Sequence, residues 1–270
     1  MNTRTTPTIP PIPTLDLRTP AGAIAIPLLG LGTWQSDGDG GYRAVRHALD
    51  VGYRHVDTAT GYGNEDQVGR AVADSGLDRA DVFLTTKLPP EAAGRERETL
   101  EQSLRLLRTD YVDLWLVHWP PNGEATPSTW QALRELRDQG LVRAIGVSNY
   151  SLAQIDQLVD ATGEAPAINQ IPWSPADHDP MVLSGHAQRG VAVEGYSPLK
   201  RTDAGDPLLT AIAETHRVTV QQVILVWHLR HRVVVIPKST RRDRIEANID
   251  ILGFTLSDEE IARIDGLSRA

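Results

Sequence analysis

The feature that most constrains the fold is a repeated alternation of short apolar strands with amphipathic helices. Apolar runs bounded by turn residues predict seven strands, at residues 53–56, 82–88, 112–117, 142–147, 167–169, 191–195 and 233–237. Helical apolar spacing follows at residues 42–49, 65–72, 95–107, 128–139, 152–161, 179–187, 208–229 (one or two helices) and 241–248. Because strands that alternate with helices pair in parallel, this pattern predicts one parallel sheet covered by helices.

The ends of the chain complete the predicted architecture. Extended runs at residues 15–18 and 23–28 predict a hairpin before the main fold, and an eighth strand is placed at residues 29–32 or in a short element that the pattern does not reveal. A last amphipathic helix is expected at residues 257–267, where Ser257 and Glu260 form a capping box. We therefore predict a (β/α)8 TIM barrel with an N-terminal β-hairpin and extra C-terminal helices, as a single domain over residues 14–270. Residues 1–13, rich in Thr and Pro, are expected to be a disordered lead.

Composition excludes several classes of function. The net charge of −8 argues against a nucleic-acid partner, which needs a basic face. The absence of cysteine excludes disulfides, thiolate metal sites and a cysteine nucleophile. No apolar run approaches membrane-spanning length and the polar start is unlike a signal peptide, so a cytoplasmic protein is expected. No metal site is expected, because six of the histidines show no ligand spacing; they are His55, His178, His186, His216, His228 and His231.

Chemically capable side chains stand where the predicted strands end. Residues 52–65 read GYRHVDTATGYGNE, in which a strand stops at Asp57 and a turn presents Tyr62 between two glycines; Lys87 and His118 end two later strands. Each residue also has an ordinary structural explanation. Asp57 could be a helix cap and Tyr62 a surface phenol. Lys87 could be a solvated strand end and His118 a buried histidine. In a (β/α)8 barrel, however, these strand ends share the face on which active sites are built. Four such residues at corresponding positions indicate a site.

Carbonyl reduction is the chemistry that these four residues suit. Hydride addition to a carbonyl carbon requires an acid for the oxygen, and Tyr62 can supply that proton. The ammonium of Lys87 is expected to lower the pKa of Tyr62 from its usual value of about 10, because it favours the phenolate. Asp57 would hold Lys87 in place, and His118 would orient the substrate carbonyl.

A second group of residues suits a nicotinamide cofactor. No G-x-G-x-x-G follows a strand, so a Rossmann site is not expected. Residues 236–248 (IPKSTRRDRIEAN) instead place cations at a helix N-terminus, where they oppose the helix dipole unless they bind an anion such as a ribose 2′-phosphate. Tyr196 can stack on a nicotinamide ring, and Ser148, Asn149 and Gln170 suit its carboxamide.

The chain resembles the aldo-keto reductase family from about residue 15 to its C-terminus. The segments that carry this resemblance are GYRHVDTATGYGNEDQVG (52–69), LLRTDYVDLWLVHWP (106–120), IPKSTRRDRIEAN (236–248), GVSNY (146–150), NQ (169–170) and GYSPL (195–199). The resemblance implies a usually monomeric barrel in which Asp57, Tyr62, Lys87 and His118 are the catalytic tetrad, with Tyr62 as general acid. It implies an NADPH site comprising Ser148, Asn149, Gln170, Tyr196, Ser197, Leu199, Lys238, Ser239, Arg244 and Asn248.

Details of the sequence refine this expectation. The C-terminal segment looks most like the prokaryotic diketogluconate-reductase and methylglyoxal-reductase type. Residues 171–175 (IPWSP) replace the family's usual Glu-aromatic-His-Pro run. The loop at residues 196–206 is short and no long C-terminal loop follows the last helix, so an open substrate site and easy cofactor exchange are expected. Trp34 and Trp119 are the predicted apolar wall of the substrate pocket. Of the other tryptophans, Trp115, Trp130 and Trp227 are assigned to packing and Trp173 is left unassigned.

The leading hypothesis is an NADPH-dependent reductase of small-molecule aldehydes, α-dicarbonyls or ketones. One alternative is a nicotinamide-binding regulatory or sensor protein on the same fold with slow catalysis. A barrel isomerase or hydrolase without nicotinamide is another. The sequence does not identify the physiological carbonyl, and it leaves a weak dimer open.

Overall fold

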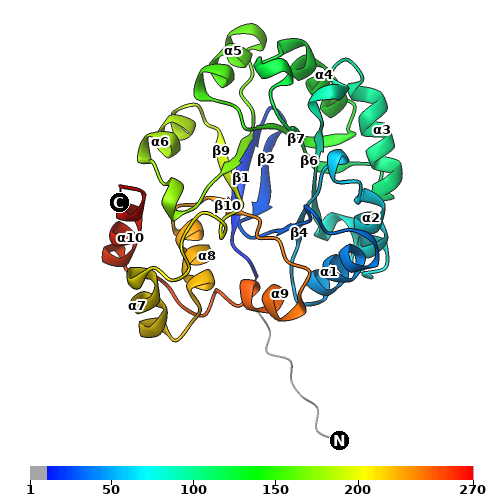
Figure 1. The fold of residues 1–270 in the computed structure, drawn as a ribbon. Helices are drawn as coiled ribbons and strands as arrows, with labels where there is room; N and C mark the ends of the chain where they lie inside the picture. The colour runs from blue at the N-terminus through cyan, green and yellow to red at the C-terminus, as the bar shows by residue number, and fades with distance from the viewer. Residues whose placement is uncertain (1–10, 270) are drawn as a thin grey trace, which may run out of the picture.

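The computed structural model describes residues 11–269, in which a central parallel sheet is surrounded by helices (Figure 1). Its eight strands follow the order β10-β9-β8-β7-β6-β5-β4-β3, and neighbouring strands pair in parallel. The strands are β3 Leu31–Gly32, β4 His55–Asp57, β5 Phe83–Leu88, β6 Val112–Val117, β7 Val142–Ser148, β8 Ile168–Pro172, β9 Ala192–Tyr196 and β10 Val234–Val235. Most of the predicted lead, residues 1–10, lies outside the described residues.

The two edges of the sheet meet, so the sheet curls into a ring. Leu29 and Gly32 form parallel bridges with Val235 and Lys238, and the amide of Gly30 donates to the carbonyl of Val235 at 2.9 Å. This arrangement is consistent with the expected (β/α)8 barrel. The eighth strand lies within the predicted residues 29–32, but only Leu31–Gly32 is regular.

The helices alternate with the strands as predicted. Their bounds are α1 Gly38–Asp50, α2 Glu65–Ala73, α3 Glu96–Leu107, α4 Pro127–Asp138, α5 Leu152–Thr162, α6 Pro180–Gln188, α7 Pro207–His216, α8 Val220–Arg230, α9 Arg242–Ile249 and α10 Asp258–Asp265. The region at residues 208–229 is therefore two helices. Arg217 ends the first in a left-handed conformation, and Thr219 begins the second with a capping box to Gln222. The predicted capping box of Ser257 and Glu260 is present at α10. No described helix is long and apolar enough to cross a membrane.

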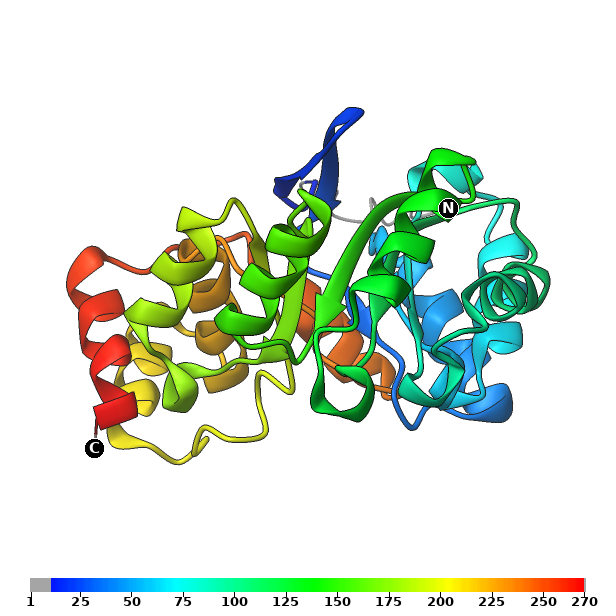
Figure 2. The same cartoon turned by 90° about the horizontal axis from the view of Figure 1, so that it is seen from above.

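The predicted hairpin covers one end of the sheet. Its strands, β1 Thr14–Thr19 and β2 Gly22–Pro27, pair antiparallel, and in Figure 2 they project beyond the helices at one side of the molecule. Leu17 and Ile26 are fully buried against residues that begin the strands, among them Phe83 of β5. The N-terminal ends of the strands are thereby closed by apolar packing, and the C-terminal ends remain for the site.

Candidate active site

The four side chains predicted to form a catalytic group come together at the C-terminal ends of the strands. Asp57 ends β4, Lys87 lies near the end of β5 and His118 follows β6. Tyr62 is presented by the short 3-10 helix η1 Thr60–Tyr62. The Nζ of Lys87 lies 2.6 Å from Asp57 Oδ1 and 3.4 Å from the Tyr62 hydroxyl. The rings of Tyr62 and His118 meet edge to face, with centroids 5.6 Å apart.

Local hydrogen bonds hold Tyr62 in this position. Gly63 ends η1 with φ of 66°, a left-handed conformation that glycine adopts at little cost. Thr60 Oγ1 donates to the Lys87 carbonyl at 3.0 Å, which ties the turn to β5. The Asn64 side chain accepts from Thr58 Oγ1 at 2.7 Å and donates to the Thr33 carbonyl at 2.8 Å. The turn that carries Tyr62 is therefore fixed from both sides.

Lys87 and Asp57 form a buried ion pair in which every charged group has partners. Lys87 is fully buried, and its three ammonium protons face Asp57, Tyr62 and the Thr58 carbonyl, the last at 2.8 Å. The other carboxylate oxygen of Asp57 accepts from Gln170 Nε2 at 2.8 Å. Burial alone lowers the pKa of Lys87, but the charge and the hydrogen bond of Asp57, with a contribution from Tyr62, outweigh it and raise the pKa. Burial raises the pKa of Asp57 against the opposing effect of Lys87. Because both oxygens of Asp57 accept from nitrogen donors, the geometry is that of an ionised carboxylate.

The expected lowering of the Tyr62 pKa was wrong. Lys87 does act in that direction, but desolvation of the phenol is larger and the pKa is raised. The sequence could place the ammonium near Tyr62, but it could not give the depth of burial. Burial, followed by the charge of Lys87, lowers the pKa of His118 to about 3. Both side chains are consequently neutral at neutral pH.

These residues open into a cavity of about 490 Å³. The residues that line it are Gly32, Thr33, Trp34, Asp57, Gly61, Tyr62, His118, Trp119, Ser148, Asn149, Gln170, Tyr196, Ser197, Lys200, Ile236 and Lys238. Trp34 and Trp119, the predicted substrate wall, are each about half exposed at 50% and 49%, so they border the cavity without being covered. Trp115, Trp130 and Trp227 are buried as predicted, and Trp173 is buried with them.

The residues predicted to bind the nicotinamide line the cavity and are linked by hydrogen bonds. We call this group the polar floor; it consists of Ser148, Asn149, Gln170 and Tyr196. Ser148 Oγ donates to the Gln170 carbonyl at 2.9 Å, and Asn149 Nδ2 donates to Ser148 Oγ at 2.9 Å. The Tyr196 hydroxyl donates to Asn149 Oδ1 at 2.9 Å. Gln170 Nε2 donates both to Asp57 and to Glu194, the latter at 3.0 Å. The amide protons of Gln170 thus point into the protein.

The residues assigned to the adenosine 2′-phosphate are arranged differently. Lys238 lines the cavity, whereas Ser239, Arg244, Asn248 and Leu199 do not. Ser239 and Asn248 are buried, Leu199 packs against the core, and Lys238 and Arg244 are exposed. Arg241 is neutralised by Asp243 at 2.5 Å. Within residues 11–269, Lys238, Arg242 and Arg244 form no salt bridge.

Sequence reasoning missed Glu194 on β9, which shares the Gln170 amide group with Asp57. Glu194 is fully buried; its Oε2 accepts from Gln170, and its Oε1 has no hydrogen bond and lies 3.7 Å from His55 Nε2. Burial, and then the charge of Asp57, raise the pKa of Glu194 to about 8. The signal was present as a carboxylate inside the apolar run VAVEGY at residues 191–196.

Comparisons with known proteins point to one family. The model of the aldo/keto reductase family matches residues 28–269. An aldo-keto reductase from Mycobacterium sp. (strain JLS) is 43% identical over 91% of both chains. Morphine 6-dehydrogenase from Pseudomonas putida is 39% identical over 90% of this chain and 88% of that protein. Methylglyoxal reductase DkgA from Escherichia coli (strain K12) is 37% identical over 90% of each.

Solved structures give the same result. An aldo/keto reductase from Brucella melitensis superposes with a TM-score of 0.90 at 42% identity, over 95% of this chain and 99% of that one. A Bombyx mori aldo-keto reductase in complex with NADP superposes with a TM-score of 0.85 at 36% identity, over 95% of this chain and 93% of that one.

Proposed function

The chain belongs to the aldo/keto reductase family, and we propose that it is an NADPH-dependent reductase of aldehydes, α-dicarbonyls or ketones. The observation that carries the proposal is the contact of the buried Lys87 ammonium with both Asp57 and the Tyr62 hydroxyl. We also infer a complete (β/α)8 barrel from the bridges that join its edge strands. From the family resemblance and the composition of the sequence, we propose a monomeric, cytoplasmic protein.

Tyr62 is the general acid in this proposal. The nicotinamide, when bound, supplies a hydride to the carbonyl carbon. Because burial raises the pKa of Tyr62, its hydroxyl is protonated at neutral pH and donates that proton to the carbonyl oxygen as negative charge develops there. The phenolate that remains faces the Lys87 ammonium, which stabilises it until a proton returns from solvent.

His118 is the second group that acts on the carbonyl oxygen. With its pKa lowered to about 3, its imidazole is neutral and offers one N–H as a hydrogen-bond donor. Its ring meets the Tyr62 ring edge to face on the wall of the same cavity. Two neutral donors directed at one oxygen stabilise the developing charge and orient the carbonyl.

The polar floor fits a nicotinamide carboxamide. The amide protons of Gln170 are taken by Asp57 and Glu194, which leaves its side-chain oxygen as an acceptor for the carboxamide N–H. Ser148 and Asn149 add a hydroxyl and an amide beside it. At the other end, Lys238 and Arg244 are exposed cations without salt bridges among the described residues, which suits a 2′-phosphate and favours NADPH over NADH.

Substitution of Tyr62 by Phe tests the proposal. Consumption of NADPH and NADH would be followed with methylglyoxal, diketogluconate, an aromatic aldehyde and a ketone ester. We expect Tyr62→Phe to lower kcat roughly 10²–10⁴-fold, as loss of a general acid does, while cofactor binding measured by fluorescence is retained. Tyr42→Phe, which removes a hydroxyl bonded to Asp74 away from the cavity, should leave kcat unchanged.

The outcomes separate the alternatives. Tight NADPH binding without turnover of any carbonyl by the wild-type protein would favour the regulatory or sensor function. Absence of NADPH binding would reject both the reductase and the sensor function, and would favour an isomerase or hydrolase without nicotinamide. Retention of full turnover by Tyr62→Phe would remove Tyr62 from the mechanism.

A further inference from the structure

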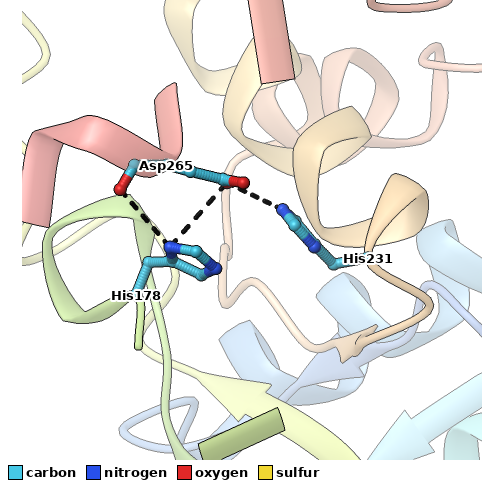
Figure 3. Close-up of side chains that lie close together, drawn as sticks. All are labelled: His178, His231 and Asp265. Carbon is cyan, nitrogen blue, oxygen red and sulfur yellow. Dashed lines mark hydrogen bonds and ion pairs between the residues drawn. The ribbon is translucent and has the colours of Figure 1, made fainter. Parts of the chain in front are cut away.

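Three side chains from distant parts of the chain meet, as Figure 3 shows. His178 follows the 3-10 helix η5 Pro175–Asp177, His231 caps the C-terminus of α8, and Asp265 is the last residue of α10. None of them lines the cavity that contains Tyr62. We propose that these three side chains bind a divalent transition-metal ion of the Zn²⁺ class.

The ligand atoms are spaced as such an ion requires. His231 Nε2 lies 2.8 Å from Asp265 Oδ1, His178 Nδ1 lies 3.9 Å from the same oxygen, and one ligand atom from each residue falls within 4.8 Å of the others. Nitrogen and oxygen ligands lie about 2.0–2.2 Å from Zn²⁺, so in a tetrahedral site they are roughly 3.4 Å apart. The observed separations bracket that value, and side-chain shifts on the order of 1 Å would complete the arrangement.

Hydrogen bonding alone leaves one member of the group poorly partnered. Asp265 Oδ1 accepts from Trp227 Nε1 at 2.8 Å and is in hydrogen-bond contact with His231. His178 Nδ1 is too far from that oxygen for a hydrogen bond, and its contact with the Asp265 carbonyl, at 3.4 Å, is longer than a usual N–H···O bond. A cation between the carboxylate and both imidazoles would satisfy His178.

A second His–carboxylate pair on the same helix provides the contrast. His216 of α7 lies 2.8 Å from Glu260 of α10. Within residues 11–269, only the His178 group has three His, Cys, Asp or Glu ligand atoms close enough to share an ion. The His216 pair is therefore complete as a pair, whereas the three side chains of the His178 group are spaced to share an ion.

The surroundings hold the three ligands in place. Trp173 stacks on Trp227 at a centroid distance of 6.4 Å, and His178 packs edge-on against both rings. Trp173 lies in the IPWSP segment that departs from the family's usual run. The hydrogen bond from Trp227 orients the Asp265 carboxylate, as outer partners of metal ligands do. The side chains of His231 and Asp265 are 19% and 26% exposed, so an ion can enter from solvent and retain a water ligand.

Two imidazoles with one carboxylate select the type of ion. Imidazole nitrogen suits Zn²⁺ and its neighbours in the transition series, whereas Mg²⁺ and Ca²⁺ prefer oxygen ligands. A bound ion would join η5, α8 and α10. Since the unfolded chain does not hold these ligands together, binding would stabilise the folded state.

The test uses the full chain without a histidine tag, which would itself bind metal. We expect calorimetric titration with ZnCl₂ to give one saturable site per chain, and thermal unfolding to shift to higher temperature with Zn²⁺ but not with Mg²⁺ or Ca²⁺. His178→Gln is the decisive variant, because His178 makes no short hydrogen bond that the folded state would lose. It should bind Zn²⁺ at least tenfold more weakly, and its own unfolding temperature should no longer rise when Zn²⁺ is added; His231→Gln should do the same for binding.

His216→Gln is the matched control and should bind Zn²⁺ as the wild type does. Substitution of Co²⁺ would report the site independently, through a visible absorption band that His178→Gln loses. Absence of a saturable Zn²⁺ site would overturn the proposal. Binding that persists in His178→Gln, or that falls equally in His216→Gln, would overturn it as well, because the ion would then lie elsewhere.

Discussion

The two ends of the proposed cofactor site are built in opposite ways. At the catalytic end, Lys87 and Asp57 are buried, and each polar atom of the pair has a hydrogen-bond partner before any ligand arrives. At the phosphate end, Lys238 and Arg244 are exposed and form no salt bridge with any described residue. A reacting group must be fixed in low dielectric to act on developing charge, whereas a cation that grips an anion can be ordered by the ligand. The difference separates residues that set the rate from residues that set cofactor affinity.

Substitution of one lysine at each end gives the largest contrast. We expect Lys87→Met to lower kcat at least roughly 10²-fold and to lower the free energy of unfolding by about 3 kcal/mol, because it leaves the Asp57 carboxylate buried without its counter-ion. Lys238→Met should raise KM for NADPH, leave kcat unchanged and alter stability by less than about 0.5 kcal/mol. Steady-state kinetics and urea unfolding measure both. Equal effects of the two substitutions would abolish the distinction between the ends.

The buried Glu194 at the catalytic end should make the stability of the protein depend on pH, which the exposed phosphate end should not do. The pKa of Glu194, about 8 in the folded state, lies above the usual value of 4.5. Between about pH 4.5 and pH 8 the folded protein therefore keeps a proton on Glu194 that the unfolded chain has released. The stability contributed by this group is fully present below about pH 4.5 and is lost as pH rises through about 8. Glu194→Gln, which remains neutral, should therefore unfold with less pH dependence than the wild type, and it should gain stability relative to the wild type between pH 6 and pH 9.

Urea unfolding at pH 6 and pH 9 tests this expectation. Glu135→Gln, at an exposed position on α4, serves as the control and should follow the wild type. An unchanged difference between the two pH values in Glu194→Gln would show that Glu194 is already ionised in the folded protein.

The smallest expected effect concerns cofactor choice. Arg244→Ala should reduce the preference for NADPH over NADH about tenfold with little change in kcat, since it removes one charge-assisted contact worth about 1.5 kcal/mol. Arg241→Ala should do less, because Asp243 already neutralises Arg241. The ratio of kcat/KM for the two cofactors measures this, and its dependence on ionic strength should weaken in Arg244→Ala. A larger effect from Arg241→Ala would reassign the phosphate contact.

Much of the fold followed from periodicity alone. The strand at residues 112–117 has the predicted bounds, and the hairpin, the two helices in 208–229 and the capping box at Ser257 are present. Periodicity left two places open for the strand that closes the sheet, because two regular residues, Leu31–Gly32, are too few for a pattern. Its pairing is decided by neighbours on both sides.

Some features of the candidate site also followed from the sequence, and others depended on the tertiary structure. The order of strands and helices, and the polar residues at strand ends, determined that Asp57, Tyr62, Lys87 and His118 would lie on one face, because a parallel sheet aligns the ends of its strands. The net pKa of Tyr62, the burial of Glu194 beside Gln170, and the meeting of His178, His231 and Asp265 were decided only by the tertiary structure. Desolvation and contacts between distant elements depend on packing in three dimensions, and one-dimensional spacing carries no measure of either.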